Sequence, residues 1–347
     1  MEKNIPEQEL VSIIRKLLKL VFFLLTIIVF LVADNIFNFS TFFVKRIKTK
    51  NIKKEIATKK EDLWEPSDES LLNSNSQKEL ILFGKDLIAN TSTYFGPKGK
   101  IFSSSNGMNC QNCHLHAGTK PFGNNFGSVA SIYPKFRERS GSVENIYKRI
   151  NDCFERSLNG SPLDTNSREM HAMASYIQWL GEGVPKGEKA KGSGLKDIPY
   201  IDRAADEAKG ELVYLNKCQS CHLDNGQGQL NKEGTAYQYP PLWGINSYND
   251  AAGLFRISSF AKFVKYNMPL GVNHNNPQLT DEEAWDVAAF VNSQPRPHKN
   301  VPYDWPKKEK KPIDMPFGPY ADLFTESQHK YGPFKPIVAY YEKMAKK

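Results

Sequence analysis

The sequence contains little cysteine, only a short apolar run and no recognisable nucleic-acid motif. Five of its 347 residues are cysteines. The formal net charge of +8 favours anionic partners, but much of the excess lies in the basic segment 44–60, so net charge identifies no site. The aromatic residues gather with Pro and Gly rather than with that segment. We therefore expect no nucleic acid among the partners.

The N-terminal segment combines a basic stretch at 15–19 with the apolar run at 20–33. This run suits the core of a signal peptide and is short for a membrane helix, which needs about 20 apolar residues. Signal peptidase prefers small residues, whereas Leu31 occupies the third position before a cut after residue 33, which favours an uncleaved anchor. The basic segment 44–60 argues against easy translocation. We expect residues 1–63 to form a signal or membrane-anchor segment and a basic linker.

The rest of the chain shows helical apolar spacing, which predicts helices over 77–90, 167–181, 203–217 and 280–294. A segment rich in Gly, Lys and Pro at 181–197 is a linker candidate. The end of the chain has many Pro, Lys and aromatic residues with little periodicity, and we expect an extended tail there. We predict a mainly α-helical chain with two domains in tandem and a C-terminal tail, at 64–196, 197–295 and 296–347.

Two pentapeptides carry the clearest chemistry, CQNCH at 110–114 and CQSCH at 218–222. Two cysteines three residues apart reach the two vinyl groups of one porphyrin as thioethers, and the adjacent His ligates the iron. Zinc or a redox C-x-x-C pair is the alternative, but both motifs end in His and follow a predicted helix. We therefore predict two c-type cytochrome domains with two covalently bound haem c groups, held by Cys110, Cys113 and His114, and by Cys218, Cys221 and His222.

Each iron needs a sixth ligand or an open site. Met268 in YNMPLG precedes the last helix, where small c-type cytochromes present an axial Met, although a buried core Met is the alternative. Met ligation raises the potential and suits outer-sphere electron transfer. Because haem c is normally attached outside the cytoplasmic membrane, we expect the folded part in the periplasm, tethered to the inner membrane if the N-terminal segment is uncleaved.

The two halves form a diverged internal repeat of helix, C-x-x-C-H, loop and closing helix. Aligning ASYIQ at 174–178 with AAFVN at 288–292 fixes an offset of 114 residues. This offset places Met268 opposite position 154, next to Cys153. A structural thiol, which often behaves as a small buried hydrophobe, or an intermolecular disulfide is the alternative for this cysteine. Its position in the repeat favours ligation of the first haem.

A thiolate ligand would set the first haem apart, because a strong donor stabilises ferric iron and lowers the potential. By the repeat offset, Met170 and Met173 fall inside the closing helix, and we expect them in the core. Nearby cations would lower the pKa of the Cys153 thiol and keep it nucleophilic. Arginine also suits forked binding of oxyanions. The flanking segment supplies Lys135, Arg137, Arg139, Arg149 and Arg156. These features predict redox chemistry on a small sulfur oxyanion, with electrons leaving through the second haem.

Three longer segments carry a family resemblance: NGMNCQNCHLHAGTKPFGNNF, YPKFRERSGSVENIYKRINDCFERSLNG and DWPKKEKKPIDMPFGPYADLF. They resemble the dihaem thiosulfate dehydrogenases that form tetrathionate, also called bifunctional tetrathionate reductases. The similarity runs from about Trp64 to the C-terminus, which leaves out only the N-terminal segment and linker. It implies the reversible conversion of two thiosulfates into tetrathionate and two electrons, which pass to a one-electron carrier protein such as a periplasmic cytochrome c.

The same resemblance implies roles for individual residues. It places a His/Cys pair, here His114 and Cys153, on the first, catalytic haem and lets the cysteine form a covalent sulfur adduct. Its substrate pocket uses Arg and Ser residues, which correspond to Arg139, Arg149 and Ser157. The second haem is His/Met, here His222 and Met268. Some members place a Lys beside this Met, whereas Asn267 precedes it here and the nearest Lys is Lys265, which argues against a Lys/Met exchange.

Other interpretations predict different ligands or partners. A dihaem electron carrier without catalysis would use Met170 or Met173 on the first haem. A cytochrome of the sulfur-oxidising carrier-protein pathway also pairs haem with Cys, but the length and the tail motifs fit it poorly. A dihaem peroxidase would want an open site near an acidic residue that the sequence does not reveal.

Overall fold

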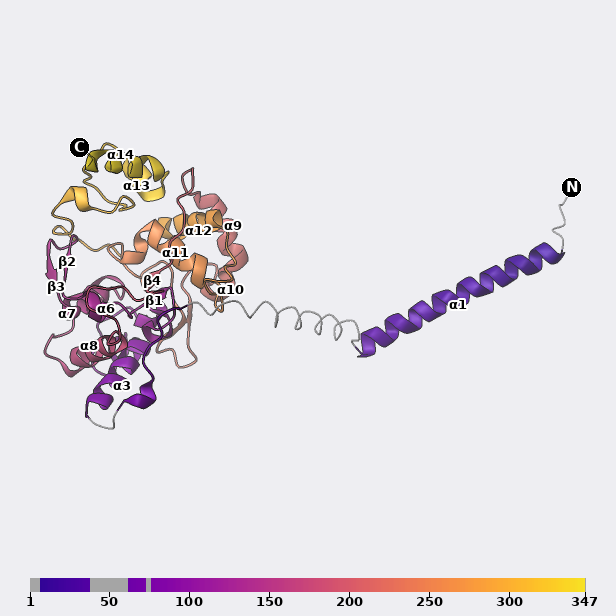
Figure 1. Ribbon diagram of the computed structural model, residues 1–347, viewed down its shortest axis with the longest axis horizontal. Coiled ribbons are helices and arrows are strands. Elements are labelled where there is room, and N and C mark those ends of the chain that lie inside the picture. The colour runs from indigo at the N-terminus through magenta and orange to yellow at the C-terminus, as the bar shows by residue number, and fades with distance from the viewer. Residues whose placement is uncertain (1–6, 38–61, 73–75, 347) are drawn as a thin grey trace. The chain divides into compact units, whose positions relative to one another are not determined.

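The computed structural model describes residues 7–37, 62–72 and 76–346 (Figure 1). The chain divides into two units, residues 1–62 and residues 63–347. Within the first unit the described residues form one helix, α1 (Glu7–Phe37). Over the described ranges, no helix combines the length and the apolar character that a membrane crossing requires. The predicted membrane anchor is therefore not confirmed, and the predicted basic linker at 44–60 lies outside the described residues.

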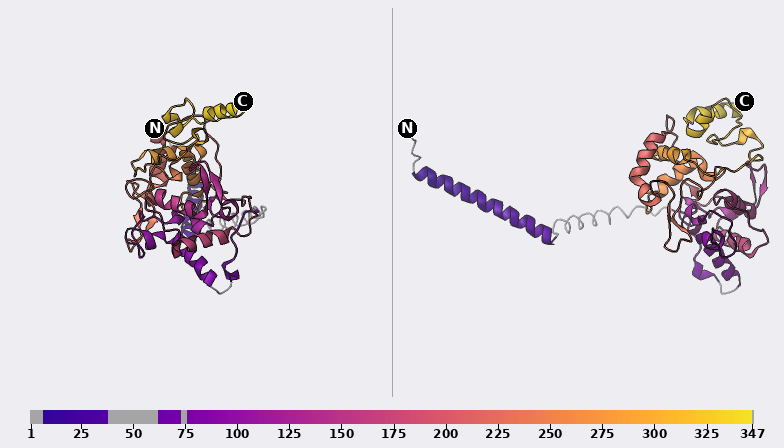
Figure 2. Two further views of the ribbon diagram at one scale, coloured as in Figure 1. Left: turned by 90° about the vertical axis from the view of Figure 1, so that its left-hand side faces the viewer. Right: turned by 180° about the vertical axis from the view of Figure 1, so that it is seen from behind.

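The second unit is built on two helix pairs. The first pair is α3 (Ser76–Ala89) against α8 (Arg168–Leu180), and the second is α9 (Glu207–Lys217) against α12 (Asp281–Ser293). Each pair lies in its own hydrophobic cluster. Figures 1 and 2 show the purple and magenta helices of the first half beside the orange helices of the second half. The four helices predicted from apolar spacing are confirmed, with their ends displaced by at most four residues.

Two glycines show that the internal repeat extends to backbone packing. A Cβ on Gly84 of α3 would lie 2.0 Å from the carbonyl oxygen of Ala172, and one on Gly210 of α9 would lie 1.9 Å from that of Asp286. Only glycine permits such a close approach of two helices. The two carbonyl partners are separated by the same 114 residues as the sequence alignment, so the predicted repeat is confirmed.

The remaining elements are short and position the loops. One longer helix in each half lies between the C-x-x-C-H motif and the closing helix: α7 (Ile146–Arg156) and α11 (Ile257–Asn267). The short helices are α4 (Thr91–Phe95), α5 (Leu115–Gly118), α6 (Val129–Ile132) and α10 (Gln219–His222). The 3-10 turns are η1 (Glu69–Leu71), η2 (Cys110–Asn112), η3 (Gly253–Phe255) and η4 (Lys308–Lys310). The predicted mainly α-helical class is confirmed.

The strands in the described part of the chain form three antiparallel two-stranded ladders. β1 (Gly123–Asn125) pairs with β4 (Gly194–Leu195), β2 (Lys135–Arg137) with β3 (Ser142–Glu144), and β5 (Gln229–Leu230) with β6 (Tyr237–Tyr239). In the first ladder, β4 belongs to the linker candidate at 181–197 and pairs with β1 in the loop that follows the first C-x-x-C-H motif.

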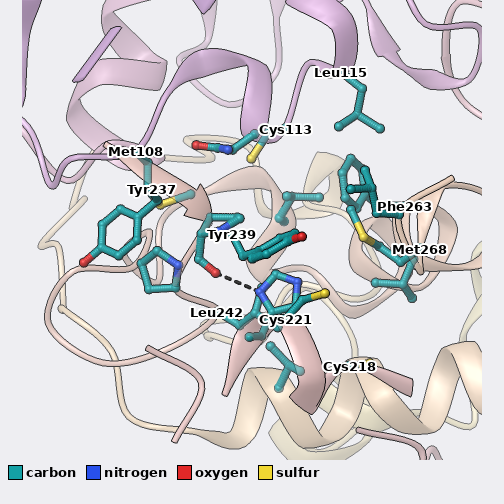
Figure 3. Close-up of a pocket in the computed structure, with 18 of the residues that line it drawn as sticks. Met108, Cys113, Leu115, Cys218, Cys221, Tyr237, Tyr239, Leu242, Phe263 and Met268 are labelled. Atoms are coloured by element: carbon teal, nitrogen blue, oxygen red, sulfur yellow. Dashed lines mark hydrogen bonds between the residues drawn. The ribbon is translucent and has the colours of Figure 1, made fainter. Parts of the chain in front are cut away.

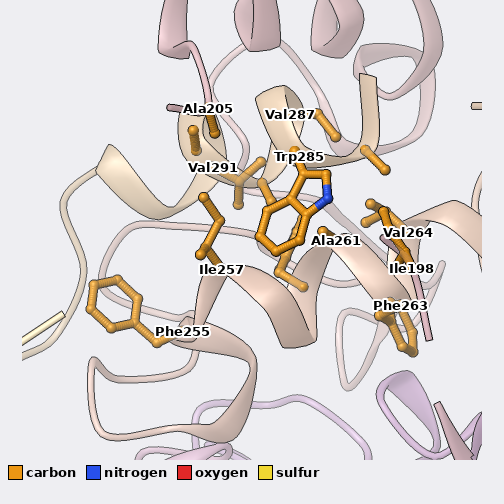
Figure 4. Packing of buried hydrophobic residues seen from close by; sticks show 14 of the residues in the cluster. Ile198, Ala205, Phe255, Ile257, Ala261, Phe263, Val264, Trp285, Val287 and Val291 are labelled. Carbon is orange, nitrogen blue, oxygen red and sulfur yellow. The ribbon is translucent and has the colours of Figure 1, made fainter. Parts of the chain in front are cut away.

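The second core surrounds Trp285, which is fully buried and lies among the apolar side chains of α11 and α12 (Figure 4). Its Nε1 donates to the carbonyl oxygen of Pro199 at 2.9 Å, which satisfies the one polar atom of the ring. Helix α12 begins at a reciprocal capping box, in which Thr280 and Glu283 each accept from the other's backbone N–H. The cap and the buried ring together fix the helix that closes the second half.

The prediction of an extended tail over 296–347 is wrong for its last part. Residues Glu326–Tyr331 form α13 and Lys335–Ala345 form α14. Phe334 and Ile337 are buried against the second core, and the Phe334 ring lies 5.5 Å from that of Trp285. Helix α13, with six residues, provides too few apolar positions for a periodic pattern, and short helices depend on tertiary packing for their stability. The domain boundaries at 64, 197 and 296 stay a prediction.

Candidate functional site

The CQSCH motif opens onto a cavity of about 400 Å³ in the second half of the chain. Cys218, Cys221, His222 and Met268 line this cavity, together with apolar side chains such as Phe263 (Figure 3). His222 Nδ1 lies 2.8 Å from the carbonyl oxygen of Pro240, a contact that orients the ring and leaves Nε2 free for a metal. Met268 follows the last residue of α11 and bonds through its backbone N–H to Val264 O at 3.0 Å.

The CQNCH motif divides its two cysteines between two cavities. Cys113 lines the 400 Å³ cavity with Met108 and Leu115 from the same segment (Figure 3), whereas Cys110 lines a second cavity of about 130 Å³. The first haem motif therefore forms part of the wall of the second haem's cavity. The two attachment sites therefore adjoin at this segment.

The 130 Å³ cavity brings together His114 and Cys153, the two residues that the sequence pairs at the first haem. His114 Nδ1 lies 2.6 Å from the carbonyl oxygen of Asn124, the same kind of orienting contact as that of His222. The ring of Phe126 lies 4.5 Å from the His114 ring between their centroids. Met173 also lines this cavity, whereas Met170 does not, and both are buried in the core as expected.

Helix α7 places Arg149 one turn before Cys153. Arg149 Nη1 donates to Cys153 Sγ at 3.1 Å, and both side chains line the cavity. Burial alone would raise the pKa of the Cys153 thiol, but the charge of Arg149 and the hydrogen bond and charge of His114 outweigh it and lower the pKa from 9.0 to about 7. The charge of Cys153 in turn raises the pKa of Arg149. The pair favours a buried thiolate.

Cys153 and Met268 differ in their backbone setting, although the repeat offset aligns Met268 with position 154, next to Cys153. Met268 lies just beyond the end of α11, whereas Cys153 lies inside α7, which continues to Arg156. The shorter Cys side chain extends from a helix that itself lines the cavity, with Arg149, Ile150 and Phe154 as neighbours. The local backbone therefore differs between the two positions expected to provide the sixth ligands.

The other two residues expected to bind substrate are outside the lining of the 130 Å³ cavity. Arg139 lies in the turn between β2 and β3 with its side chain 14% exposed, and its guanidinium stacks over the Trp305 ring at 5.7 Å. Burial, assisted by the charge of Arg156, lowers the pKa of Arg139 to about 10. Ser157 ends α7, and its backbone N–H donates to the carbonyl oxygen of Cys153.

Two tail residues that the sequence did not single out lie beside these arginines. Asp304 accepts from Arg156 Nη1 at 2.7 Å and Nη2 at 2.8 Å, and lies 3.9 Å from Arg139 Nε. The Trp305 backbone N–H donates to the carbonyl oxygen of Arg139 at 2.7 Å. The segment DWPKKEKKPIDMPFGPYADLF, which supports the resemblance, was the one available signal, but its spacing from Cys153 gives no indication of contact.

The residues present fit two c-type haems. Each cavity holds at least one motif cysteine, and a histidine whose Nδ1 is fixed on a carbonyl oxygen, with a sulfur ligand candidate in the same cavity. The larger cavity is lined mostly by apolar and aromatic residues, as a porphyrin requires.

Known protein families match both halves of the chain that carry the C-x-x-C-H motifs. The model for "SoxA/TsdA, cytochrome c domain" matches residues 100–185, and the model for "Cytochrome c" matches residues 207–295. Thiosulfate dehydrogenase of Stutzerimonas stutzeri is 37% identical over 237 residues, which are 68% of this chain and 74% of that protein. The chain belongs to the thiosulfate dehydrogenase family. It carries two covalently attached c-type haems, and both C-x-x-C-H motifs fit their attachment.

A second relative and a solved structure are also similar to this chain. Thiosulfate dehydrogenase of Allochromatium vinosum is 40% identical over 196 residues, which are 55% of this chain and 71% of that protein. The solved structure of thiosulfate dehydrogenase (TsdBA) from Marichromatium purpuratum in its "as isolated" form superposes with a TM-score of 0.63 at 31% identity. That alignment covers 68% of this chain and 50% of the solved chain, so this chain spans half the length of that structure.

Proposed function

We propose that this chain oxidises thiosulfate to tetrathionate, and that it does so in the 130 Å³ cavity with Cys153 as the nucleophile. Family membership supports the reaction. The single observation that carries the site is the hydrogen bond from Arg149 to the Cys153 sulfur at 3.1 Å, which favours the thiolate in a buried cavity beside His114. We propose that His114 and Cys153 would ligate the iron of the first haem, and that His222 and Met268 would ligate that of the second.

The reaction divides into two sulfur–sulfur steps. First, the Cys153 thiolate bonds to the sulfane sulfur of one thiosulfate dianion, which leaves a cysteine S-thiosulfonate monoanion and two electrons. Second, another thiosulfate attacks the sulfane sulfur of this adduct, which releases the tetrathionate dianion and restores the thiolate. No proton is taken up or released in either step. The bound haems supply one-electron redox chemistry, so two of them have the capacity for both electrons.

The protein's own contribution is orientation and charge compensation. Two thiosulfate dianions repel each other, and a buried guanidinium reduces that repulsion more strongly than a solvated one. Arg149 is placed for this at the cavity wall. The resemblance assigns Arg139 and Ser157 to substrate binding as well. Their positions near α7, with Arg139 fixed by Trp305 and Asp304, are compatible with an anion that enters from the side of the tail.

Electrons are proposed to leave through the second haem to a one-electron carrier such as a periplasmic cytochrome c. Two observations support this path. Cys113 lines the second cavity, so the two haem attachment sites adjoin. Leu270 lines the same cavity and is 73% exposed, which brings the cavity wall to the surface, as electron transfer to an external carrier requires. We propose a periplasmic location because haem c is attached there. Tethering to the inner membrane through residues 1–63 stays a prediction.

Steady-state rates on the purified dihaem protein test the activity in both directions. Thiosulfate with an artificial one-electron acceptor should give tetrathionate, and tetrathionate with a reductant should give thiosulfate. The alternative of a non-catalytic carrier predicts turnover in neither direction. EPR of the ferric protein separates the ligand sets, because a low-spin haem with a thiolate ligand has a narrow spread of g values. Two His/Met signals would favour the carrier, with Met173 as the ligand from the first cavity.

A further inference from the structure

Arg296 is a cation whose hydrogen-bonding capacity is largely unused. It follows α12 by three residues, and its Nη2 donates to the carbonyl oxygen of Val291 at 2.6 Å. Its Nε and Nη1 atoms are buried and have no hydrogen-bond partner among the described residues. Buried N–H groups of a guanidinium are rarely left unpaired, because the lost hydration is not compensated. The arrangement requires an acceptor that the polypeptide does not provide.

Neighbouring groups hold Arg296 firmly in place. Its guanidinium lies 4.4 Å from the ring centroid of Tyr248 and 4.9 Å from that of Phe255. Asp250 is an acidic residue nearby in the fold, but its carboxylate is engaged by His298 Nδ1 at 2.5 Å and the backbone N–H of Lys299 at 2.9 Å. Among the described residues no carboxylate pairs with Arg296, so an anion from outside the polypeptide would satisfy both the charge and the unused donors.

The location identifies this anion. Two of the three residues that contact Arg296, Tyr248 and Val291, line the 400 Å³ cavity, and the third, Phe255, directly follows Leu254, which lines it as well. None of these three lines the 130 Å³ cavity. A haem carries two propionate carboxylates. We propose that Arg296 binds a propionate of the haem held by Cys218, Cys221 and His222.

This role has a consequence for the second haem that is independent of thiosulfate chemistry. An ionised propionate favours ferric iron, and a guanidinium paired with it offsets that effect. Arg296 therefore keeps the potential of the second haem high, in the same direction as the proposed Met268 ligand. The inference requires only the haem and holds whichever reaction the first cavity performs.

An EPR-monitored redox titration of the dihaem protein tests the proposal. The variant Arg296→Gln should lower the midpoint potential of the second haem and leave that of the first unchanged, because an uncompensated propionate stabilises the ferric form. Arg296→Lys keeps the charge and should shift the potential less. Lys209→Gln removes the same charge from exposed α9, where the side chain is 59% exposed, and should shift neither haem. An unchanged second potential in Arg296→Gln, or a shift confined to the first haem, would overturn the proposal.

The unaltered protein provides a second test if Arg296→Gln does not retain its haems. A crystal structure of the dihaem protein should show Nε or Nη1 of Arg296 within hydrogen-bonding distance of a propionate oxygen of the second haem. A structure in which both atoms bond to water, to protein or to the first haem would overturn the assignment.

Discussion

Arg149 lies one helical turn before Cys153 on α7, and its Nη1 donates to the cysteine sulfur at 3.1 Å. Side chains four residues apart share a helix face, so the backbone itself fixes this pair without any tertiary adjustment. The face they share lines the 130 Å³ cavity together with the haem motif residues Cys110 and His114. A buried cation is thus built into the same element as the proposed nucleophile.

Removing this cation should slow the reaction while the haems remain attached. A hydrogen bond to a charged group contributes about 1.5–3 kcal/mol, so Arg149→Met should lower kcat/KM for thiosulfate by about 10- to 100-fold. Lys209→Gln, on α9 with its side chain 59% exposed, removes a positive charge away from this cavity, so it is the control and should stay near wild type. Equal rates for Arg149→Met and wild type would contradict the role given to Arg149.

The tail should contribute to the first site through Asp304. Asp304→Asn keeps the shape but removes the charge that pairs with both Nη atoms of Arg156, so the free energy of unfolding should fall by about 2 kcal/mol. Denaturant unfolding of the dihaem protein measures this loss. In a double-mutant cycle with Arg156→Met, the two losses should not add, because each change breaks the same pair. Fully additive losses would show that the pair is not coupled in solution.

The close helix contacts predict two sensitive positions and one tolerant one. Gly84→Ala and Gly210→Ala each place a methyl group about 2 Å from a backbone oxygen, and should lower the free energy of unfolding by about 1–3 kcal/mol. Gly183→Ala, where a Cβ meets nothing within 4 Å, should have little effect. Thermal and denaturant unfolding compare the three. A stabilising effect at Gly210 would contradict the packing, since alanine favours an otherwise unhindered helix.

The stability of the fold should fall at acid pH, because the tail contains a hydrogen-bonded buried carboxylate. The side chain of Asp322 is buried and accepts from His329 Nε2 at 3.0 Å and from Tyr341 Oη at 2.6 Å. Burial acts to raise the pKa of Asp322, but the hydrogen bonds of Tyr341, His329 and the Phe324 backbone outweigh it and lower the pKa below 3.8. A lowered folded-state pKa means that ionised Asp322 stabilises the fold above pH 4, and that this contribution is lost as pH falls through the lowered value.

Asp322→Asn should therefore lower the free energy of unfolding by about 1–3 kcal/mol at pH 7. At pH 3 this loss relative to wild type should be smaller. Asp202→Asn removes a carboxylate that is 87% exposed and should cost little at either pH. Denaturant unfolding of the three proteins at both pH values measures the differences. A cost that is the same at pH 7 and pH 3 would contradict the ionised state of Asp322 in the fold.

The sequence could predict what depends on local spacing. Each C-x-x-C-H motif is contiguous, and four of the helices have apolar positions at helical spacing. The offset of 114 residues fixed which closing-helix positions are equivalent, and the carbonyl oxygens of Ala172 and Asp286 confirm it. The contact between Arg149 and Cys153 follows from their spacing of four residues, but only once α7 is known to be a helix.

Contacts between distant segments could not be predicted in this way. Asp304 reaches Arg156 across 148 residues of sequence, and no periodic pattern encodes that return of the tail. Helix α13 has six residues, too few for a periodic signal, and α14 depends on Phe334 and Ile337 packing against a core formed earlier in the chain. The unused donors of Arg296 appear only when every neighbouring acceptor is known.

The variant Cys153→Gly tests the central claim most directly. Both haems must be shown to remain attached, and Met173→Leu, which alters the same cavity without touching the sulfur nucleophile, serves as the matched control. Steady-state thiosulfate oxidation by Cys153→Gly should fall by about 10³-fold or more, because both sulfur–sulfur steps require the thiolate, while Met173→Leu keeps its activity. Turnover of thiosulfate by Cys153→Gly at the wild-type rate would contradict the account.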